Sequence, residues 1–401
     1  MKVRAERGRL VDALAIAGRA VSTRSSLQVL SGVLLQADEK GLELSATDME
    51  ISIRTPIDCT VDEPGSVVLN ARVLTDIAKS LAEGEVVIEQ RAGESQVEIH
   101  AGGSLFSLHS QPAGDFPGFP VFPVENGFTV EKEAFLDTID MVARSASRDE
   151  TRPVLTGVLI HVTKSTVQMV ATDSYRLSMK ETAVKASVAD RVEAIIPARS
   201  LLELSRIGRA AAVDTLTVIP GENQVLFDIG GVWLISRLID GQFPNYRQLL
   251  PESFDHEVEV DQKEFLDVVH RVGLMAQRNA PIRLRFAENT LTVSAESQDV
   301  GRARESFPIR YAGEELEIGF NPEFLEDGAR VAGARRSGAA GRLGDGGGAA
   351  AGEGDEGQTA AVSHPESVPI YLKFISPLRP GLLQGESEDF LYIIMPIRLT
   401  D

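Results

Sequence analysis

The residue types that most often carry catalytic chemistry do not gather into a motif in this chain. The six histidines stand at positions 100, 109, 161, 256, 270 and 364, without the HExxH spacing of a metal site. No G-x-S-x-G elbow or dinucleotide-binding loop is present, and Gly344–Gly348 is not followed by the G-K-[ST] of a phosphate loop. These features predict a protein that is not an enzyme and uses neither a metal nor a cofactor.

Two aspartates nevertheless recur at matching places. Asp48 ends the string Ser-Ala-Thr-Asp, Asp173 ends Val-Ala-Thr-Asp, and a fainter copy stands at 294–297. Paired carboxylates can act as general acid and base. Their repetition in successive copies of one pattern instead indicates turn chemistry that belongs to a fold. We therefore expect both aspartates to be structural.

The elements around these aspartates occur three times. A helical stretch that runs into an alternating pattern spans residues 10–35, returns at 135–160 and returns again at 265–286. A period of about 125–130 residues is too long for a solenoid and indicates three copies of one domain.

Two segments rich in proline and glycine, 111–127 and 239–254, are natural linkers between the copies. They predict domains at 1–120, 121–252 and 253–401.

Each copy reads as helix, strands, helix, strands. In the first copy Leu10, Leu14, Ala17 and Val21 form an apolar stripe at helical spacing, and the segments after them alternate with period two. The second helices are expected at 71–83, 198–208 and 321–331. The pattern predicts an α+β class, with two helices packed on an antiparallel sheet in each domain. Open sheet edges of such units would pair with a neighbour, giving a ring if the contact closes and a filament if it does not.

Composition bounds the location of the protein. The single Cys59 excludes an intrachain disulfide framework and is expected to be packed rather than nucleophilic. There is no apolar run of about 18 residues, and the N-terminus lacks the apolar core of a signal peptide. We expect a soluble cytoplasmic protein with no membrane partner. The net charge of −19, taken alone, argues against nucleic acid as a partner.

Several strings resemble the bacterial β sliding clamps, the processivity subunits of the replicative DNA polymerase. The strings are FSLHSQPAGDFP (106–117), VATDSYRLS (170–178), DGQFPNYRQLLP (240–251), GFNPEFLEDG (319–328) and YIIMPIRL (392–399). The resemblance covers residues 1–328 and 368–401. It implies a subunit of three clamp domains that dimerises head to tail into a ring around duplex DNA, with twelve helices lining the hole. It also implies that the ring tethers the polymerase, the clamp loader and repair proteins through short linear motifs.

The charge distribution agrees with this implication. The six segments expected to line the ring together carry about +4, which leaves about −23 for the rest of the chain. A mildly basic lining holds DNA by long-range attraction, and no recognition helix for base edges stands out, so binding should be independent of sequence. Arg24 matches a family DNA contact, and Arg148 and Arg199 lie beside or at such positions. The residues expected to face DNA are Arg19, Arg24, Arg72, Lys79, Arg144, Arg148, Arg199, Arg206, Arg271 and Arg278.

The resemblance also implies a partner groove between the second and third domains. Leucine, isoleucine, methionine and proline are typical of an exposed peptide-binding cleft, and arginines at its edge can pair with a peptide. Tyr175 replaces the histidine common in the family, and without the resemblance YIIMPIRL would read as an ordinary strand. The expected groove residues are Arg152, Leu155, Thr172, Tyr175, Arg176, Leu177, Pro244, Leu249, Ile393, Met395, Pro396, Ile397 and Arg398.

The resemblance also implies which residues form the contact between subunits. Phe106 and Leu108, on one face of a strand, match the family's contact with Leu274 and Met275 of a third-domain helix. From the sequence alone, an internal core role suits these four residues equally well.

Residues 329–367 depart from the family pattern. They are dominated by glycine and alanine, lack apolar periodicity and are expected to form a flexible insert. Two interpretations stay open: a lineage-specific loop, or a locally shifted reading frame. For the whole chain, the alternative to a clamp is a scaffold that binds peptides without encircling DNA, and an enzyme acting on acidic polymers comes third.

Overall fold

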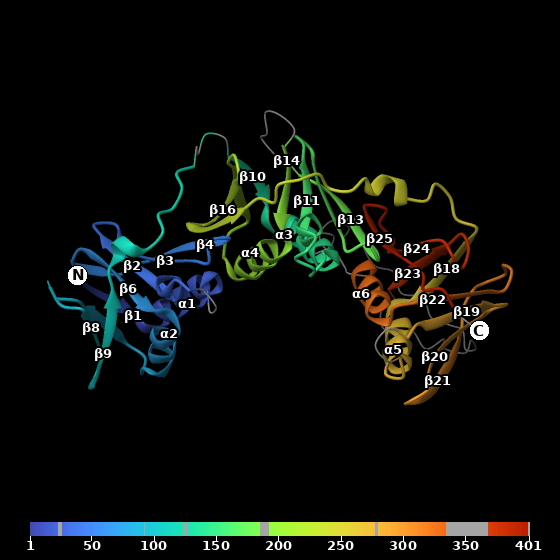
Figure 1. Ribbon diagram of the computed structural model, residues 1–401, viewed down its shortest axis with the longest axis horizontal. Coiled ribbons are helices and arrows are strands. Elements are labelled where there is room, and N and C mark those ends of the chain that lie inside the picture. Colours follow the sequence, from blue (N-terminus) through green and yellow to red (C-terminus); the bar gives the residue numbers. More distant parts are fainter. Residues whose placement is uncertain are drawn as a thin grey trace, which may run out of the picture. The chain divides into compact units, whose positions relative to one another are not determined.

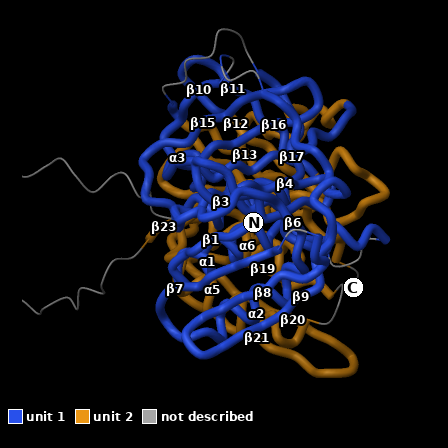
Figure 2. The backbone as a smooth tube through the Cα atoms, turned by 90° about the vertical axis from the view of Figure 1, so that its left-hand side faces the viewer, with its two compact units in different colours: residues 1–140, 157–167, 183–241 blue, residues 141–156, 168–182, 242–401 orange. Residues whose placement is uncertain are grey.

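A computed structural model of the chain (Figure 1) describes residues 1–22, 26–91, 93–122, 125, 127–184, 192–276, 280–333 and 368–399. Most of the expected insert at 329–367 lies outside the described residues. The backbone divides into two compact units (Figure 2). Unit 1 comprises residues 1–140, 157–167 and 183–241, and unit 2 comprises residues 141–156, 168–182 and 242–401.

Six α-helices occur in the described part of the chain, and most begin at a polar cap. The side chains of Glu6, Asn70, Asp261 and Asn321 each accept a hydrogen bond from a backbone N–H of the first turn. Asn321 and Pro322 therefore form the cap and first-turn pair that the sequence predicts. The helices are α1 (Arg7–Ala17), α2 (Ala71–Ser80), α3 (Lys132–Val142), α4 (Ala198–Ala210), α5 (Gln262–Gly273) and α6 (Pro322–Ala332).

The strands belong to three successive groups along the chain. The first repeat holds β1 (Lys2–Glu6), β2 (Gly32–Asp38), β3 (Gly41–Thr47), β4 (Ile51–Ile57), β5 (Thr60–Glu63), β6 (Gly65–Asn70), β7 (Glu85–Glu89), β8 (Gln96–Ala101) and β9 (Ser104–Gln111). The second holds β10 (Phe128–Glu131), β11 (Gly157–Val162), β12 (Thr166–Thr172), β13 (Arg176–Ala183), β14 (Val192–Pro197), β15 (Thr215–Pro220), β16 (Gln224–Ile229) and β17 (Val232–Arg237). The third holds β18 (His256–Asp261), β19 (Ile282–Ala287), β20 (Thr290–Ser297), β21 (Gly301–Pro308), β22 (Leu316–Phe320), β23 (Pro369–Phe374), β24 (Gly381–Gln384) and β25 (Phe390–Ile394).

Unit 1 contains one long sheet with the strand order β10-β15-β16-β17-β4-β3-β2-β6-β9-β8-β7-β1-β5. Strand β17 of the second repeat pairs antiparallel with β4 of the first, with Leu234 opposite Ile53. Helices α1 and α2 contact each other, and α1 also contacts β3 and β4. Helix α4 packs on β11 and β14. The apolar helix faces are thus buried against strands, as the α+β class requires.

Unit 2 contains the strand order β13-β25-β24-β23-β18 and a second sheet with the order β21-β20-β19-β22. Helix α5 contacts β20, and α6 contacts both α5 and β25. The ring of Phe374 packs at a tilt against those of Phe286 and Phe320 in the core, with centroid distances of 5.3 and 6.0 Å. The third repeat therefore has the same two-helix, antiparallel-sheet construction as the first.

The repeated aspartates form matching turns. In the first repeat Asp48 accepts hydrogen bonds from the backbone N–H groups of Glu50 and Ile51, and Met49 has a φ of 77°. In the second, Asp173 accepts from Tyr175 and Arg176, and Ser174 has a φ of 80°. Each carboxylate thus holds a strand-to-strand turn in a left-handed conformation.

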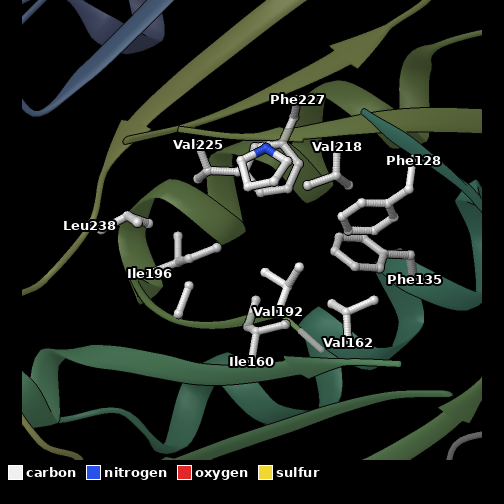
Figure 3. A pocket seen from close by; sticks show the side chains of 12 residues that line it. Phe128, Phe135, Ile160, Val162, Val192, Ile196, Val218, Val225, Phe227 and Leu238 are labelled. Carbon is white, nitrogen blue, oxygen red and sulfur yellow. The ribbon is translucent and has the colours of Figure 1, made fainter. Parts of the chain in front are cut away.

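A small apolar cavity lies in the second repeat within unit 1 (Figure 3). Its volume is about 30 Å³, and its walls include Val162, Val218, Phe135 and Phe227. The lining is entirely apolar, so an ordered water would find no hydrogen-bond partner there. The core of this repeat is underpacked by about one methyl group.

Candidate partner groove and basic helix faces

All thirteen expected groove residues lie in unit 2, and they differ in exposure. The buried members are Leu155, Thr172, Arg176, Leu177 and Ile393. Half-buried are Met395, Pro396 and Ile397, and exposed are Arg152, Tyr175, Pro244, Leu249 and Arg398. Tyr175 is 63% exposed and Leu249 is 37% exposed, so both side chains are accessible to a partner.

Backbone hydrogen bonds bring the turn of the second repeat and the C-terminal strand together. Strand β13 pairs with β25 (Figure 1). In this pairing Arg176 is opposite Ile394. Beyond the end of β25, the Met395 N–H donates to the Tyr175 carbonyl at 2.8 Å. Arg152 donates to the Ser174 hydroxyl at 3.1 Å, which places it beside the same turn. Two segments separated by more than 200 residues therefore form one surface.

Arg176 is buried under this surface and is surrounded by partners. Its Nε donates to Asp173 at 3.1 Å, and its two terminal nitrogens donate to Asp327 at 2.6 Å and to the Arg144 carbonyl at 2.8 Å. Its guanidinium carbon also lies 4.4 Å from the ring centroid of Phe324. Most of the donors of Arg176 are used inside unit 2, so its side chain joins α6 to β13.

Tyr392 completes this cluster. Its hydroxyl donates to the Phe324 carbonyl at 2.8 Å and lies 3.4 Å from a terminal nitrogen of Arg176. Burial raises the pKa of the Tyr392 hydroxyl well above its ordinary value, although the nearby guanidinium opposes the shift. The ring packs so closely on α6 that a Cβ at Gly328 would lie 2.4 Å from it. Position 328 therefore requires glycine.

The basic residues expected to face DNA divide into ion-paired and free groups. Arg19 pairs with Glu203 at 2.9 Å, Arg199 with Asp48 at 2.7 Å, and Arg271 with Glu305 at 2.7 Å. The remaining pairs are Arg206 with Glu203 and, at 3.9 Å, Arg72 with Asp76. Lys79, Arg144 and Arg148 form no ion pair within the described ranges, and Arg24 and Arg278 lie outside those ranges.

The residues expected at the subunit contact lie at surface positions. Phe106 and Leu108 are half-buried on β9, Met275 packs against the core of unit 2, and Leu274 is 65% exposed. Strand β9 pairs with β8 from Ser104 to His109, but its pairing with β6 involves only Ser110 and Gln111. Most of one edge of β9 is therefore open in the part of the chain that the structure describes.

Sequence reasoning did not find Glu203, Asp327 or the carboxylates Asp48 and Glu305 as partners of these arginines. Asp327 lies 151 residues from Arg176, and Glu203 lies 184 residues from Arg19. No local spacing signals such a pair. The only available hint was that Glu203 is the single acidic residue of an otherwise basic helix, α4.

The three repeats, the antiparallel sheets with paired helices and the groove surface define a DNA-clamp fold. Comparison with known families identifies the family to which this chain belongs. The DNA polymerase III beta subunit family matches with its N-terminal domain at residues 1–120, its central domain at 129–245 and its C-terminal domain at 247–335. The chain belongs to this family, the bacterial beta sliding clamps.

Individual relatives agree. The beta sliding clamp of Streptomyces coelicolor is 32% identical, with all of both chains covered, and that of Micrococcus luteus is 35% identical over 77% of this chain and 99% of its own length. Among solved structures, the sliding clamp of Bacillus subtilis matches with a TM-score of 0.86 at 28% identity, covering both chains completely. The clamp of Pseudomonas aeruginosa bound to griselimycin matches with a TM-score of 0.85 at 26% identity, again over both full chains. The predicted family and fold class are confirmed.

Two kinds of feature are absent from the described residues. No helix there is both long and apolar enough to cross a bilayer. No group of three or more histidine, cysteine, aspartate or glutamate side chains in these ranges is arranged to hold a metal ion.

Proposed function

We propose that this clamp dimerises head to tail, encircles duplex DNA without sequence preference and tethers the replicative polymerase and other proteins. The observation that carries the proposal is the pairing of sheet edges. Successive repeats are joined by two strand pairs, which we call junctions: β4 with β17, and β13 with β25. In each junction, the strand that follows the first hairpin of one repeat pairs with the last strand of the next repeat. By the same rule, β21 of the third repeat in one subunit should pair with β9 of the first repeat in the other subunit.

The repeats also predict the register of that contact. Ile53 faces Leu234 at the first junction, and Ser178 faces Tyr392 at the second. The hairpins β20–β21 and β8–β9 place Ala303 and Phe106 at the equivalent positions. We therefore expect Phe106 of one subunit opposite Ala303 of the other. Ala303 and Met275 are both partly buried against the core of the third repeat.

DNA binding is supported by the charge distribution. The basic residues of the expected lining are mostly exposed, and several are compensated by carboxylates rather than left free. Phosphate attraction is then sufficient to retain DNA but too weak to fix it, as sliding requires. Base readout needs side chains aimed into a groove, and the lining residues have no such arrangement in the sequence.

The two junctions have the same backbone geometry, so their side chains can be compared to locate the partner groove. The Arg237 N–H donates to the Glu50 carbonyl at 3.0 Å, matching the bond from Met395 to Tyr175. The backbones are alike, but apolar residues of one junction stand where charged residues stand in the other. At these two positions the second junction has Met395 and Tyr175 where the first has Arg237 and Glu50, so it offers the more apolar surface for a hydrophobic peptide motif. This difference favours one partner groove per subunit.

Three further parts of the proposal rest on the family and the sequence. The clamp has no catalytic activity of its own, since its repeated aspartates are used in turns. It works in the cytoplasm, where its polymerase partners act. Its domains span residues 1–120, 121–252 and 253–401.

Engineered disulfides test the ring contact. In a Cys59→Ser background, Phe106→Cys with Ala303→Cys should give covalently closed dimers, because directly opposed Cβ atoms lie about 4.5–5.5 Å apart. The control pair Ser107→Cys with Ala303→Cys is shifted by one residue, which turns one side chain to the other face. Equal crosslinking of both pairs, or of neither, would contradict the register.

Paired substitutions test the groove. Met395→Ala with Pro396→Ala should abolish binding of a polymerase-derived peptide and leave the dimer intact. Arg237→Ala with Leu238→Ala, at the equivalent place in the first junction, should not change the peptide Kd. Unchanged affinity in the first variant would show that the groove is assigned wrongly.

A further inference from the structure

One carboxylate, Glu203, occupies the centre of a basic helix face in unit 1. It pairs with Arg19 at 2.9 Å and with Arg206, which follows it by three residues on α4. The Glu203 side chain is only 14% exposed, whereas those of Arg19 and Arg206 are 37% and 57% exposed. The two cations therefore face solvent while the anion between them is shielded.

Basic residues surround Glu203 both on its own helix and from another segment of the chain. On α4, Arg199, Glu203 and Arg206 follow one another at spacings of four and three, so all three share one face. Glu203 is the only acidic residue of α4, and the buried residues Leu201 and Leu204 lie on the other side of the helix. Arg19 reaches the same carboxylate from the segment after α1. Glu203 is thus shared by basic residues from two separate parts of the chain.

We propose that Glu203 is an affinity-setting residue that holds the DNA affinity of this face low. The inference rests on the proposed function, in which α1 and α4 line the DNA channel. A phosphate approaching Arg19 or Arg206 must compete with Glu203 for the same N–H groups, and it meets the repulsion of the carboxylate. The carboxylate weakens phosphate contacts without removing the basic residues.

The physical consequence is a smaller number of phosphates neutralised per subunit. Each phosphate contact contributes a slope of about −0.9 to the dependence of log affinity on log salt. Releasing Arg19 and Arg206 from Glu203 adds one or two contacts, which steepens the slope by about 0.9–1.8. A clamp that bound these phosphates tightly would diffuse more slowly along the duplex.

Glu203→Gln is the test, because it removes the charge and keeps the shape. Binding to an open-ended duplex of about 12 base pairs, roughly one helical turn, is measured by fluorescence anisotropy from about 50 to 200 mM salt. The variant should bind about three- to twelvefold more tightly than the parent at the lowest salt, with the advantage lost at the highest. Its melting temperature is measured alongside, to show that it is folded.

The matched control is Asp62→Asn. Asp62 pairs with Arg4 at 2.6 Å between strands β1 and β5, so this variant makes the same change in net charge on strands, outside α1 and α4. Asp62→Asn should leave both affinity and salt slope as in the parent. An equal gain in the two variants would mean that net charge alone acts, and would overturn the role of Glu203.

A double variant separates the contribution of Arg19 from that of Arg206. Adding Arg19→Ala to Glu203→Gln should remove about half of the gain in salt slope. If Glu203→Gln equals the parent while the parent binds DNA with a measurable salt slope, the inference fails and the proposed function stands. If the parent itself shows no salt-dependent DNA binding, the proposed function fails.

Discussion

Replacing the buried Arg176 by methionine should destabilise unit 2 strongly. Methionine keeps most of the packing on Phe324 but leaves Asp173, 14% exposed, without its guanidinium partner, and the Arg144 carbonyl without its donor. Breaking a buried ion pair by removing one partner costs about 3–5 kcal/mol. Asp327 is 37% exposed and can be rehydrated, so we expect the lower end, about 3 kcal/mol.

Calorimetry measures this cost. For a folding unit of this size each kcal/mol lowers the melting temperature by about 2–4 °C, so Arg176→Met should lower it by about 6–12 °C. The control is Arg152→Met, which removes an exposed arginine of the same surface and should change the stability by less than about 0.5 kcal/mol.

The same variants distinguish a structural from a binding role. Below its melting temperature Arg176→Met should retain most of its affinity for a polymerase-derived peptide, because the donors of Arg176 are occupied within the protein. A variant with an unchanged melting temperature and a large loss of peptide affinity would refute this reasoning and make Arg176 a direct peptide ligand.

Three other changes have expected outcomes. Val162→Ile adds one methylene to the 30 Å³ cavity and should stabilise the protein to urea by about 0.7 kcal/mol, whereas Val167→Ile in a filled core should destabilise it. Gly328→Ala should lower the melting temperature, because a Cβ only 2.4 Å from the buried Tyr392 ring places the overpacking cost near the upper end of about 1–3 kcal/mol, above the helix-propensity gain of about 1 kcal/mol. The backbone N–H groups of Arg9 and Gly8 lower the pKa of Glu6 in the folded state, so its contribution to stability is present above roughly pH 4.3 and is lost as the pH falls. Urea titrations between about pH 6 and about pH 3 measure this loss. The free energy of unfolding should fall less steeply with decreasing pH in Glu6→Gln than in the parent.

Much of the fold could be predicted from the sequence because its signals are local. Helical periodicity located the six helices, and the repeated Thr-Asp strings marked turns that the structure shows hydrogen bond by hydrogen bond. The first helix begins at Arg7, three residues before the predicted Leu10, because Glu6 supplies the cap. Strand β6 was not predicted, because its buried residues Val67, Val68 and Leu69 are consecutive and do not alternate with polar residues.

The candidate site was less predictable for a physical reason. The types of residue in the groove follow from the chain, but the burial of Arg176 depends on Asp327 and Tyr392, which fold onto it from the third repeat. The basic residues of the lining could be counted, but their compensation by Glu203, Asp48 and Glu305 depends on tertiary contacts. Charge summed over segments therefore overstates how many cations are free for DNA.

Retention on circular DNA tests the central claim most directly. The clamp is loaded by its loader onto a nicked circle, separated from free protein by gel filtration, and the circle is then cut once. A closed ring should remain with the circle and leave after linearisation, because only an open end lets it slide off. Equal loss from the circular and the linear form, or equal retention on both, would contradict a protein that encircles DNA.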